Sequence, residues 1–355
     1  MKWRVIKAPA AARQAPLAAA VFVCLLAVAA CGSSGTSAPG PSKSSVASTF
    51  STSGAKPGLP SSGTSAVGGT WSAATSIDPG NALQSVSCAS TSFCVAVDAS
   101  SGGSGTPGNA FTYNGTAWSA PVAIDANFSL ISVSCPTTSV CAAVDNSGNA
   151  FTFNGSSWTT SSGVDTNPFQ SLSCASPSFC VAVDNSADGT IWNGSAWSSP
   201  QPFGSSTGGP NFAVSCSASF CMAIGGTGAY TFNGSSWSSE HALSSGASEP
   251  IAVSCPSASF CVVVTYDGSA YTYNGTSWST RTTVDPGGLD GVTCQSASFC
   301  MAYDSGSSRS VTYNGSSWSA PAMVIAGAGP KSVSCPSPSF CMAIDGATNA
   351  LSWHS

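Results

Sequence analysis

Fourteen cysteines after residue 70 carry most of the chemistry that this sequence offers. They form seven close pairs with none left over, and thiols at such spacing either bind a metal or oxidise to disulfides. A metal site would need a second pair or histidines nearby, and the chain has only His241 and His354. We therefore predict no metal site but seven disulfides: Cys88–Cys94, Cys135–Cys141, Cys174–Cys180, Cys216–Cys221, Cys255–Cys261, Cys294–Cys300 and Cys335–Cys341.

The aspartates are the second group that could do chemistry. Carboxylates on one face can bind a cation or a basic partner, whereas aspartates at strand ends also form Asx-turns. Both interpretations stay open, and we predict no cofactor beyond Ca²⁺ as a candidate ion. The candidate binding face comprises the aspartates four residues after a second cysteine, Asp98, Asp145, Asp184, Asp304 and Asp345, joined by Asp78, Asp125, Asp165 and Asp285 from the connections between repeats. Gly225 and Thr265 interrupt it.

Charge and residue types narrow the function classes. The region after residue 70 has fourteen acidic residues and three basic ones, Arg281, Arg309 and Lys331, which gives a formal balance of −11. Nucleic acid and anionic lipid headgroups are disfavoured as partners because binding them requires many cations. Two arginines cannot supply the cluster that a sialidase needs, and no carboxylate pair is singled out for glycoside hydrolysis. We identify no catalytic residues.

One repeat positions all of these residues. Its first copy contains four short pieces: one ending at Cys88, one from Cys94 to Val97, one from Ala110 to Tyr113, and one that carries Trp118. They predict four β-strands, the second buried on both faces, and Asn-Gly after the third predicts a type I′ hairpin. Successive first cysteines lie 39 to 47 residues apart, which is typical of propeller blades.

The two ends of the repeat region complement each other. The last repeat stops after its third strand, at residues 351–355, and the first repeat is preceded by Gly69-Thr70-Trp71-Ser72, which has the pattern of a fourth strand. A blade shared between the termini would close the ring without a free sheet edge. We therefore predict an all-β protein, a propeller of seven four-stranded blades with one disulfide each.

The hairpin at Thr112-Tyr113-Asn114-Gly115-Thr116-Ala117-Trp118 resembles the repeats of Asp-box, sialidase-like and photosynthesis-stability-factor-like propellers. An Asp-box reads Ser/Thr-x-Asp-x-Gly-x-Thr-Trp, so this chain has Asn for Asp and one residue fewer. The resemblance covers residues 69 to 355. It implies the propeller fold, and no activity is carried over from it.

Aromatic residues follow two patterns. The tryptophan of each repeat recurs at a fixed position, which indicates packing rather than sugar stacking: Trp71, Trp118, Trp158, Trp197, Trp237, Trp278 and Trp318. Less regular aromatics in the connections are the candidate ligand contacts, namely Phe128, Phe169, Phe203 and Phe212.

The N-terminal segment predicts export. Basic residues precede an apolar run from Leu17 to Ala30, and Val28-Ala29-Ala30-Cys31 resembles a bacterial lipobox. We predict a signal peptide over 1–30, a lipid on Cys31, a flexible linker over 31–69 and the propeller over 70–355. The alternative is an ordinary secretory signal without a lipid.

These inferences favour a monomeric binding module, anchored by lipid alone to the outer face of the cell membrane. Its ligand would be an envelope glycan or protein. The alternatives are a scaffold in an envelope assembly and a carbohydrate-active enzyme, because a fold does not by itself define a function.

Overall fold

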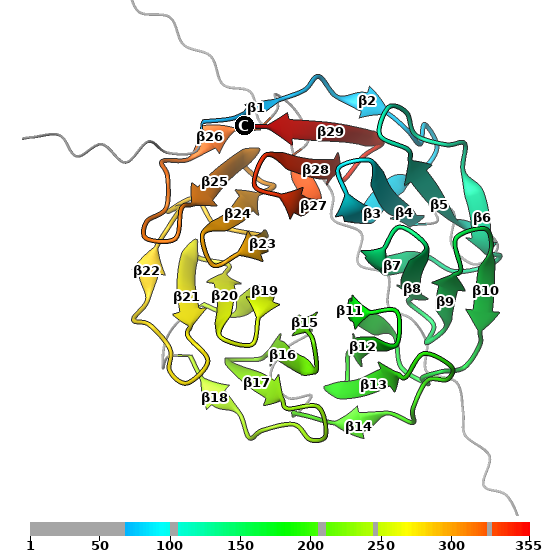
Figure 1. Ribbon diagram of the computed structural model, residues 1–355, viewed down its shortest axis with the longest axis horizontal. Coiled ribbons are helices and arrows are strands. Elements are labelled where there is room, and N and C mark those ends of the chain that lie inside the picture. Colours follow the sequence, from blue (N-terminus) through cyan, green and yellow to red (C-terminus); the bar gives the residue numbers. More distant parts are fainter. Residues whose placement is uncertain (1–67, 100–105, 205–210, 244–247, 325–328) are drawn as a thin grey trace, which may run out of the picture. The chain divides into compact units, whose positions relative to one another are not determined.

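The computed structural model describes residues 68–99, 106–204, 211–243, 248–324 and 329–355, and these form a ring of seven blades (Figure 1). Every regular element in the described ranges is a β-strand. None of them is a helix that could cross a membrane. The predicted seven-bladed propeller is confirmed.

Each blade is an antiparallel sheet whose strands we call A to D from the centre outward (Figure 1). The A strands are β3 (Ala82–Ser90), β7 (Leu130–Thr137), β11 (Phe169–Ser176), β15 (Ala213–Ser217), β19 (Pro250–Ser257), β23 (Gly291–Ser296) and β27 (Pro330–Ser337). The B strands are β4 (Phe93–Ala99), β8 (Val140–Asp145), β12 (Phe179–Asp184), β16 (Phe220–Gly225), β20 (Phe260–Thr265), β24 (Phe299–Asp304) and β28 (Phe340–Asp345).

The outer half of each blade is shorter. The C strands are β5 (Gly108–Tyr113), β9 (Ala150–Phe153), β13 (Asp188–Trp192), β17 (Gly228–Phe232), β21 (Ser269–Tyr273), β25 (Arg309–Tyr313) and β29 (Asn349–His354). The D strands are β6 (Val122–Asp125), β10 (Trp158–Ser161), β14 (Gln201–Pro202), β18 (His241–Ala242), β22 (Thr282–Thr283), β26 (Ala322–Met323) and, in the seventh blade, β1 (Thr70–Trp71) with β2 (Thr75–Ser76).

The hydrophobic core lies between blades rather than within them. Val95 and Val97 of β4 pack with Ala143 of β8, whereas Ala96, on the other face of β4, packs with Ile344 of β28. B strands are therefore buried on both faces, as their unbroken apolar sequence predicted. Because each core needs two neighbouring blades, the closure of the ring matters to all of them.

The termini close the ring in the seventh blade. Thr70 pairs with His354 and Trp71 with Trp353, which places β1 beside β29. Gly69 lies flat against the indole of Trp353, since a Cβ atom there would come within 2.2 Å of the ring. The predicted blade shared between the termini is confirmed.

All seven predicted disulfides are present, one per blade. Each joins the end of strand A to the start of strand B, and Cys88 and Cys94 are direct cross-strand neighbours. The two Cα atoms of a bridge lie 3.9 to 4.1 Å apart. A disulfide in this position fixes the A–B turn and supports the expectation of an oxidising, extracytoplasmic compartment.

Serine hydroxyls join the A strands of neighbouring blades. Ser87 Oγ accepts a hydrogen bond from the Cys135 N–H at 2.9 Å, and Ser85 Oγ accepts one from the Val133 N–H at 3.2 Å. The donor–acceptor pattern repeats at Cys88–Ser334, Val86–Ser332, Cys174–Ser134, Leu172–Ser132, Cys216–Ser173, Val214–Ser171, Cys255–Ser215 and Cys294–Ser254. We call these contacts the serine belt. Sequence reasoning gave these serines no role.

The predicted type I′ hairpin between strands C and D is wrong. Tyr113 pairs with Trp118 across a four-residue loop, and only Gly115, at φ 96°, has a positive φ. The Asn114 side chain instead accepts hydrogen bonds from the N–H groups of Thr116 and Ala117. Asn is selected here as a side-chain acceptor, not for left-handed backbone.

Replacing one disulfide by the Cys135→Ala/Cys141→Ala pair should lower the free energy of unfolding by about 2 kcal/mol, because the closed loop restricts the unfolded chain. Denaturant unfolding of the oxidised protein measures the loss. Thr138→Ala, at an exposed position inside the same loop, is the control and should change little. Equal stability of the parent and the double variant would contradict a stabilising bridge.

Ser134→Ala should destabilise the protein by about 1 kcal/mol, because the Cys174 N–H loses its acceptor. Ser132→Ala should cost less, since its bond to Leu172 is longer and alanine already occupies the matching positions 213 and 252. The two variants are compared by denaturant unfolding. A larger loss of stability in Ser132→Ala than in Ser134→Ala would contradict the greater importance of the bond between Ser134 and Cys174.

Candidate functional site

The five aspartates of the predicted binding face are buried, with exposed fractions of 0 to 5 %. Asp145 shows the arrangement: Oδ1 accepts from the N–H groups of Ser147 and Asn149, and Oδ2 accepts from Asn149 Nδ2 at 2.6 Å. Asp345 repeats it with Ala347 and Asn349. Asp145, Asp184, Asp304 and Asp345 therefore form Asx-turns, the structural alternative considered from the sequence, whereas Asp98 accepts from the main chain and side chain of Asn109 across the sheet. A basic protein could not reach them without rearranging these loops, and cation binding there stays a prediction.

A second buried aspartate accompanies the first in four blades. The connection from the preceding D strand contributes it, and the pairs are Asp78 with Asp98, Asp125 with Asp145, Asp165 with Asp184, and Asp285 with Asp304. Burial, and then the neighbouring Asp78 carboxyl, raise the pKa of Asp98 to about 6, although hydrogen bonds from Asn109 oppose the rise. Burial and Asp145 likewise raise the pKa of Asp125.

The sixth blade neutralises its pair with a side chain. Arg309 Nη2 lies 2.9 Å from Asp285 Oδ1 and 3.5 Å from Asp304 Oδ2. The fourth blade removes the pair altogether, because Gly204 and Gly225 stand at the two positions and the ring of Phe212 fills the space beside Gly225. Individual blades thus differ in the residues at these two positions and in the side chains that contact them.

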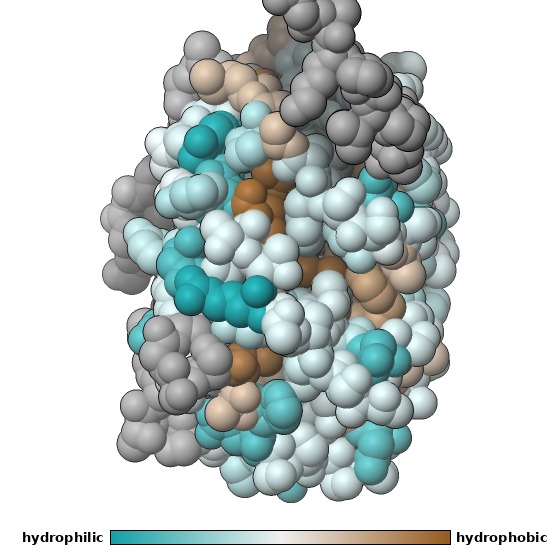
Figure 2. All heavy atoms as spheres, turned by 90° about the vertical axis from the view of Figure 1, so that its left-hand side faces the viewer, coloured by the Kyte–Doolittle hydropathy of each residue, from teal (hydrophilic) through white to brown (hydrophobic). Residues whose placement is uncertain are grey.

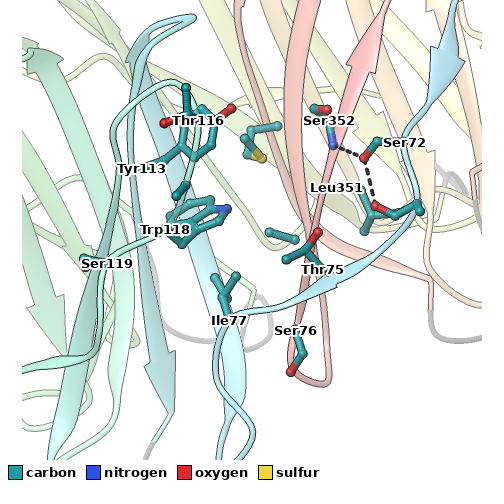
Figure 3. A pocket seen from close by; sticks show the side chains of 14 residues that line it. Ser72, Thr75, Ser76, Ile77, Tyr113, Thr116, Trp118, Ser119, Leu351 and Ser352 are labelled. Carbon is teal, nitrogen blue, oxygen red and sulfur yellow. Dashed lines mark hydrogen bonds between the residues drawn. The ribbon is translucent and has the colours of Figure 1, made fainter.

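Grooves on the outer wall are the second candidate site, and sequence reasoning did not find them. Figure 3 shows one of about 640 Å³, where Tyr113 and Trp118 of the first blade face Thr75 and Ile77 from the strand that closes the seventh. Equivalent grooves of 410 to 690 Å³ lie beside Trp197, Trp318, Trp71 and Trp278. In Figure 2, apolar surface is visible in recesses between paler rims.

The groove tryptophans pack on their own blades and leave one side open. Trp118 lies 5.4 Å from Tyr113 between ring centroids and is only half-buried. The predicted packing role is therefore confirmed, but it does not use the whole indole. In the fourth blade a second ring, that of Phe203, packs against Trp237 with centroids 5.0 Å apart, and Trp237 lines none of these five grooves.

Most of the aromatics expected to contact a ligand are core residues. Phe169, at the start of β11, and Phe203 and Phe212 are buried, so this expectation is wrong for them. Phe128 is 36 % exposed and stays a candidate. Among the described residues, no group of three or more His, Cys, Asp or Glu side chains converges. The signal segment, Cys31 and nearly all of the linker lie outside the described residues.

Asp78→Asn should stabilise the protein in chelator at pH 7.5 by about 1 kcal/mol, because the amide removes a buried like charge and can donate to Asp98. The parent should lose stability as pH rises from about 4 to about 6, since the folded-state pKa of Asp98 lies above its ordinary value. The variant should show a flatter profile. Thermal unfolding measures both, and Glu249→Gln, at an exposed position, is the control. A steeper pH profile in Asp78→Asn would contradict the pairing.

Comparison with known proteins supports the fold. No family model and no curated protein sequence matches this chain. A solved structure titled YCF48 bound to D1 peptide is similar, with a TM-score of 0.62 and 12 % identity over 82 % of this chain and 99 % of the other. YCF48 from Cyanidioschyzon merolae gives a TM-score of 0.61 with 15 % identity, over 80 % of this chain and 98 % of the other. Virginiamycin B lyase from Staphylococcus aureus gives a TM-score of 0.69 with 4 % identity, over 81 % of this chain and 100 % of the other. At these identities the similarity is one of fold.

Proposed function

We propose that this protein is an extracytoplasmic binding module that holds its ligand in the outer-wall grooves. The observation that carries the proposal is the recurrence of one groove type at five of the seven blade junctions, each beside a half-buried tryptophan. In the fourth blade Phe203 packs against Trp237, which lines none of these five grooves. A partly exposed indole beside each of the five grooves keeps an aromatic surface available to a ligand.

The chemistry of the grooves favours a neutral, hydroxyl-rich ligand, and we propose an envelope glycan. Ser72, Thr75, Ser76, Thr116, Ser119 and Ser352 line the first groove together with Trp118, and that lining contains no charged side chain. Serine and threonine hydroxyls donate and accept hydrogen bonds, while the indole contacts the C–H face of a sugar. Several grooves on one ring also suit a polymer with repeating units, because each further contact becomes intramolecular.

A protein segment is the second candidate ligand. One similar structure is of a propeller with a peptide bound, and the D strands here are two to four residues long with an outward edge. An extended peptide could add to such an edge through its main chain. A scaffold role, the remaining alternative, would show itself as a subunit that stays associated through purification.

Binding should be measured with the oxidised protein against isolated envelope glycans and, separately, against envelope proteins. Trp118→Leu and Trp318→Leu should each weaken binding about two- to tenfold, the range expected from one aromatic contact. Trp237→Leu, at a tryptophan that lines none of the five grooves, is the matched control and should leave affinity unchanged. Retention of proteins but not glycans would favour the second candidate. Equal losses in all three variants, or binding insensitive to them all, would exclude the grooves.

A further inference from the structure

Two buried carboxylate pairs lack any protein cation. Asp78 and Asp125 are 6 % and 7 % exposed, and the Oδ2 atom of each is buried without a hydrogen-bond partner in the described part of the chain. Their Oδ1 atoms are satisfied by the N–H groups of Gly80 and Asn127. Each unsatisfied oxygen belongs to a carboxyl that faces a second one, that of Asp98 or Asp145. Two ionised groups in such a place are costly unless a positive charge joins them.

The sixth blade shows what a cation does at this position. Arg309 is paired directly across the sheet from Asp304 and reaches both carboxylates of the pair. Asn109 and Asn149 occupy the same register in the first and second blades, where they donate to Asp98 and Asp145. Asparagine orients one carboxylate but brings no charge. All three basic residues after residue 70 lie in the fifth to seventh blades.

We propose that the first and second blades each bind one divalent metal cation, Ca²⁺ by its chemistry, between Asp78 and Asp98 and between Asp125 and Asp145. Hard carboxylate oxygens are the ligands that Ca²⁺ prefers, and water completes the coordination shell in sites with few protein ligands. Asp78 Oδ2 and Asp125 Oδ2 supply the free lone pairs. With two carboxylates per site, we expect a dissociation constant of about 10⁻⁴ to 10⁻³ M, the range of extracellular Ca²⁺ modules.

The proposed cation binding does not extend to the carboxylate pair of the third blade. Its Asp165 is equally buried, but Thr190 Oγ1 lies 3.4 Å from Asp165 Oδ2 and so offers that oxygen a donor.

The first site has a structural consequence that the others lack. Asp78 lies two residues after the end of β2, so a cation shared with Asp98 would fasten the strand that closes the ring to the first blade.

The test is calcium titration of the oxidised, chelator-treated protein at pH 7.5, followed by calorimetry and thermal unfolding. We expect two bound ions per chain and a Tm that rises by several degrees at millimolar CaCl₂. Asp78→Asn/Asp125→Asn should abolish both responses. Asp285→Asn, in the pair that Arg309 already neutralises, is the matched control and should keep the two ions even if its starting Tm is lower.

A gain of binding gives an independent check. Arg309→Asn places in the sixth blade the residue found in the first two, so it should bind a third ion, and its Tm should depend more strongly on Ca²⁺. The proposal is overturned if the parent shows no calcium response, if KCl at equal ionic strength gives the same shift, or if the double variant responds like the parent. None of these outcomes depends on groove binding, so the two proposals fail separately.

Discussion

The structure depends on the way neighbouring A strands are held together. Main-chain ladders run within each blade, so the N–H groups on the free side of an A strand have no strand to pair with. At six of the seven junctions the serine belt supplies their acceptors from the preceding blade, at 2.8 to 3.2 Å. These acceptors are the serines of the recurring Ser-x-Ser-Cys, in which alanine stands for the first serine at positions 213 and 252. Where Gly291 replaces serine, the Tyr303 ring occupies the space and its hydroxyl reaches the Lys331 carbonyl.

The hydrogen bonds of the serine belt help to stabilise a core that is built mainly from small side chains. Alanine, valine and cysteine fill most buried positions of the B strands, and each blade shares its core with two neighbours. Cores of this kind are limited in the apolar area that they bury, so local constraints add to stability. The disulfides act on the side of each blade where the A–B turn lies. The aspartates act on the opposite side, where they order the B–C loops through main-chain N–H donors.

Differences between blades carry the information about function. The fourth blade packs Phe203 against its tryptophan and has no acid pair, whereas the sixth has Arg309 between its carboxylates. The first and second blades have both an acid pair and no cation of their own. The belt and the shared cores hold neighbouring blades together, and each disulfide fixes the A–B turn within one blade, so these elements lie apart from the outer and loop positions at which the blades differ. The same architecture can therefore present grooves in some blades and charge in others.

The sequence by itself determined the blade count, the seven cysteine pairs and the closure by the termini, because each follows from spacing along the chain or from a strand missing at one end. It also named both roles open to the aspartates, although it could not choose between them. Burial and hydrogen-bond partners established the turn role, which depends on which residues meet across the sheet, such as Asp145 and Asn149, whereas the cation role stays a proposal. The serine belt, the open side of Trp118 and the meeting of Asp78 with Asp98 were decided only by tertiary structure. Each joins residues from different strands or blades, and a pattern within one repeat cannot show what the next blade places against it.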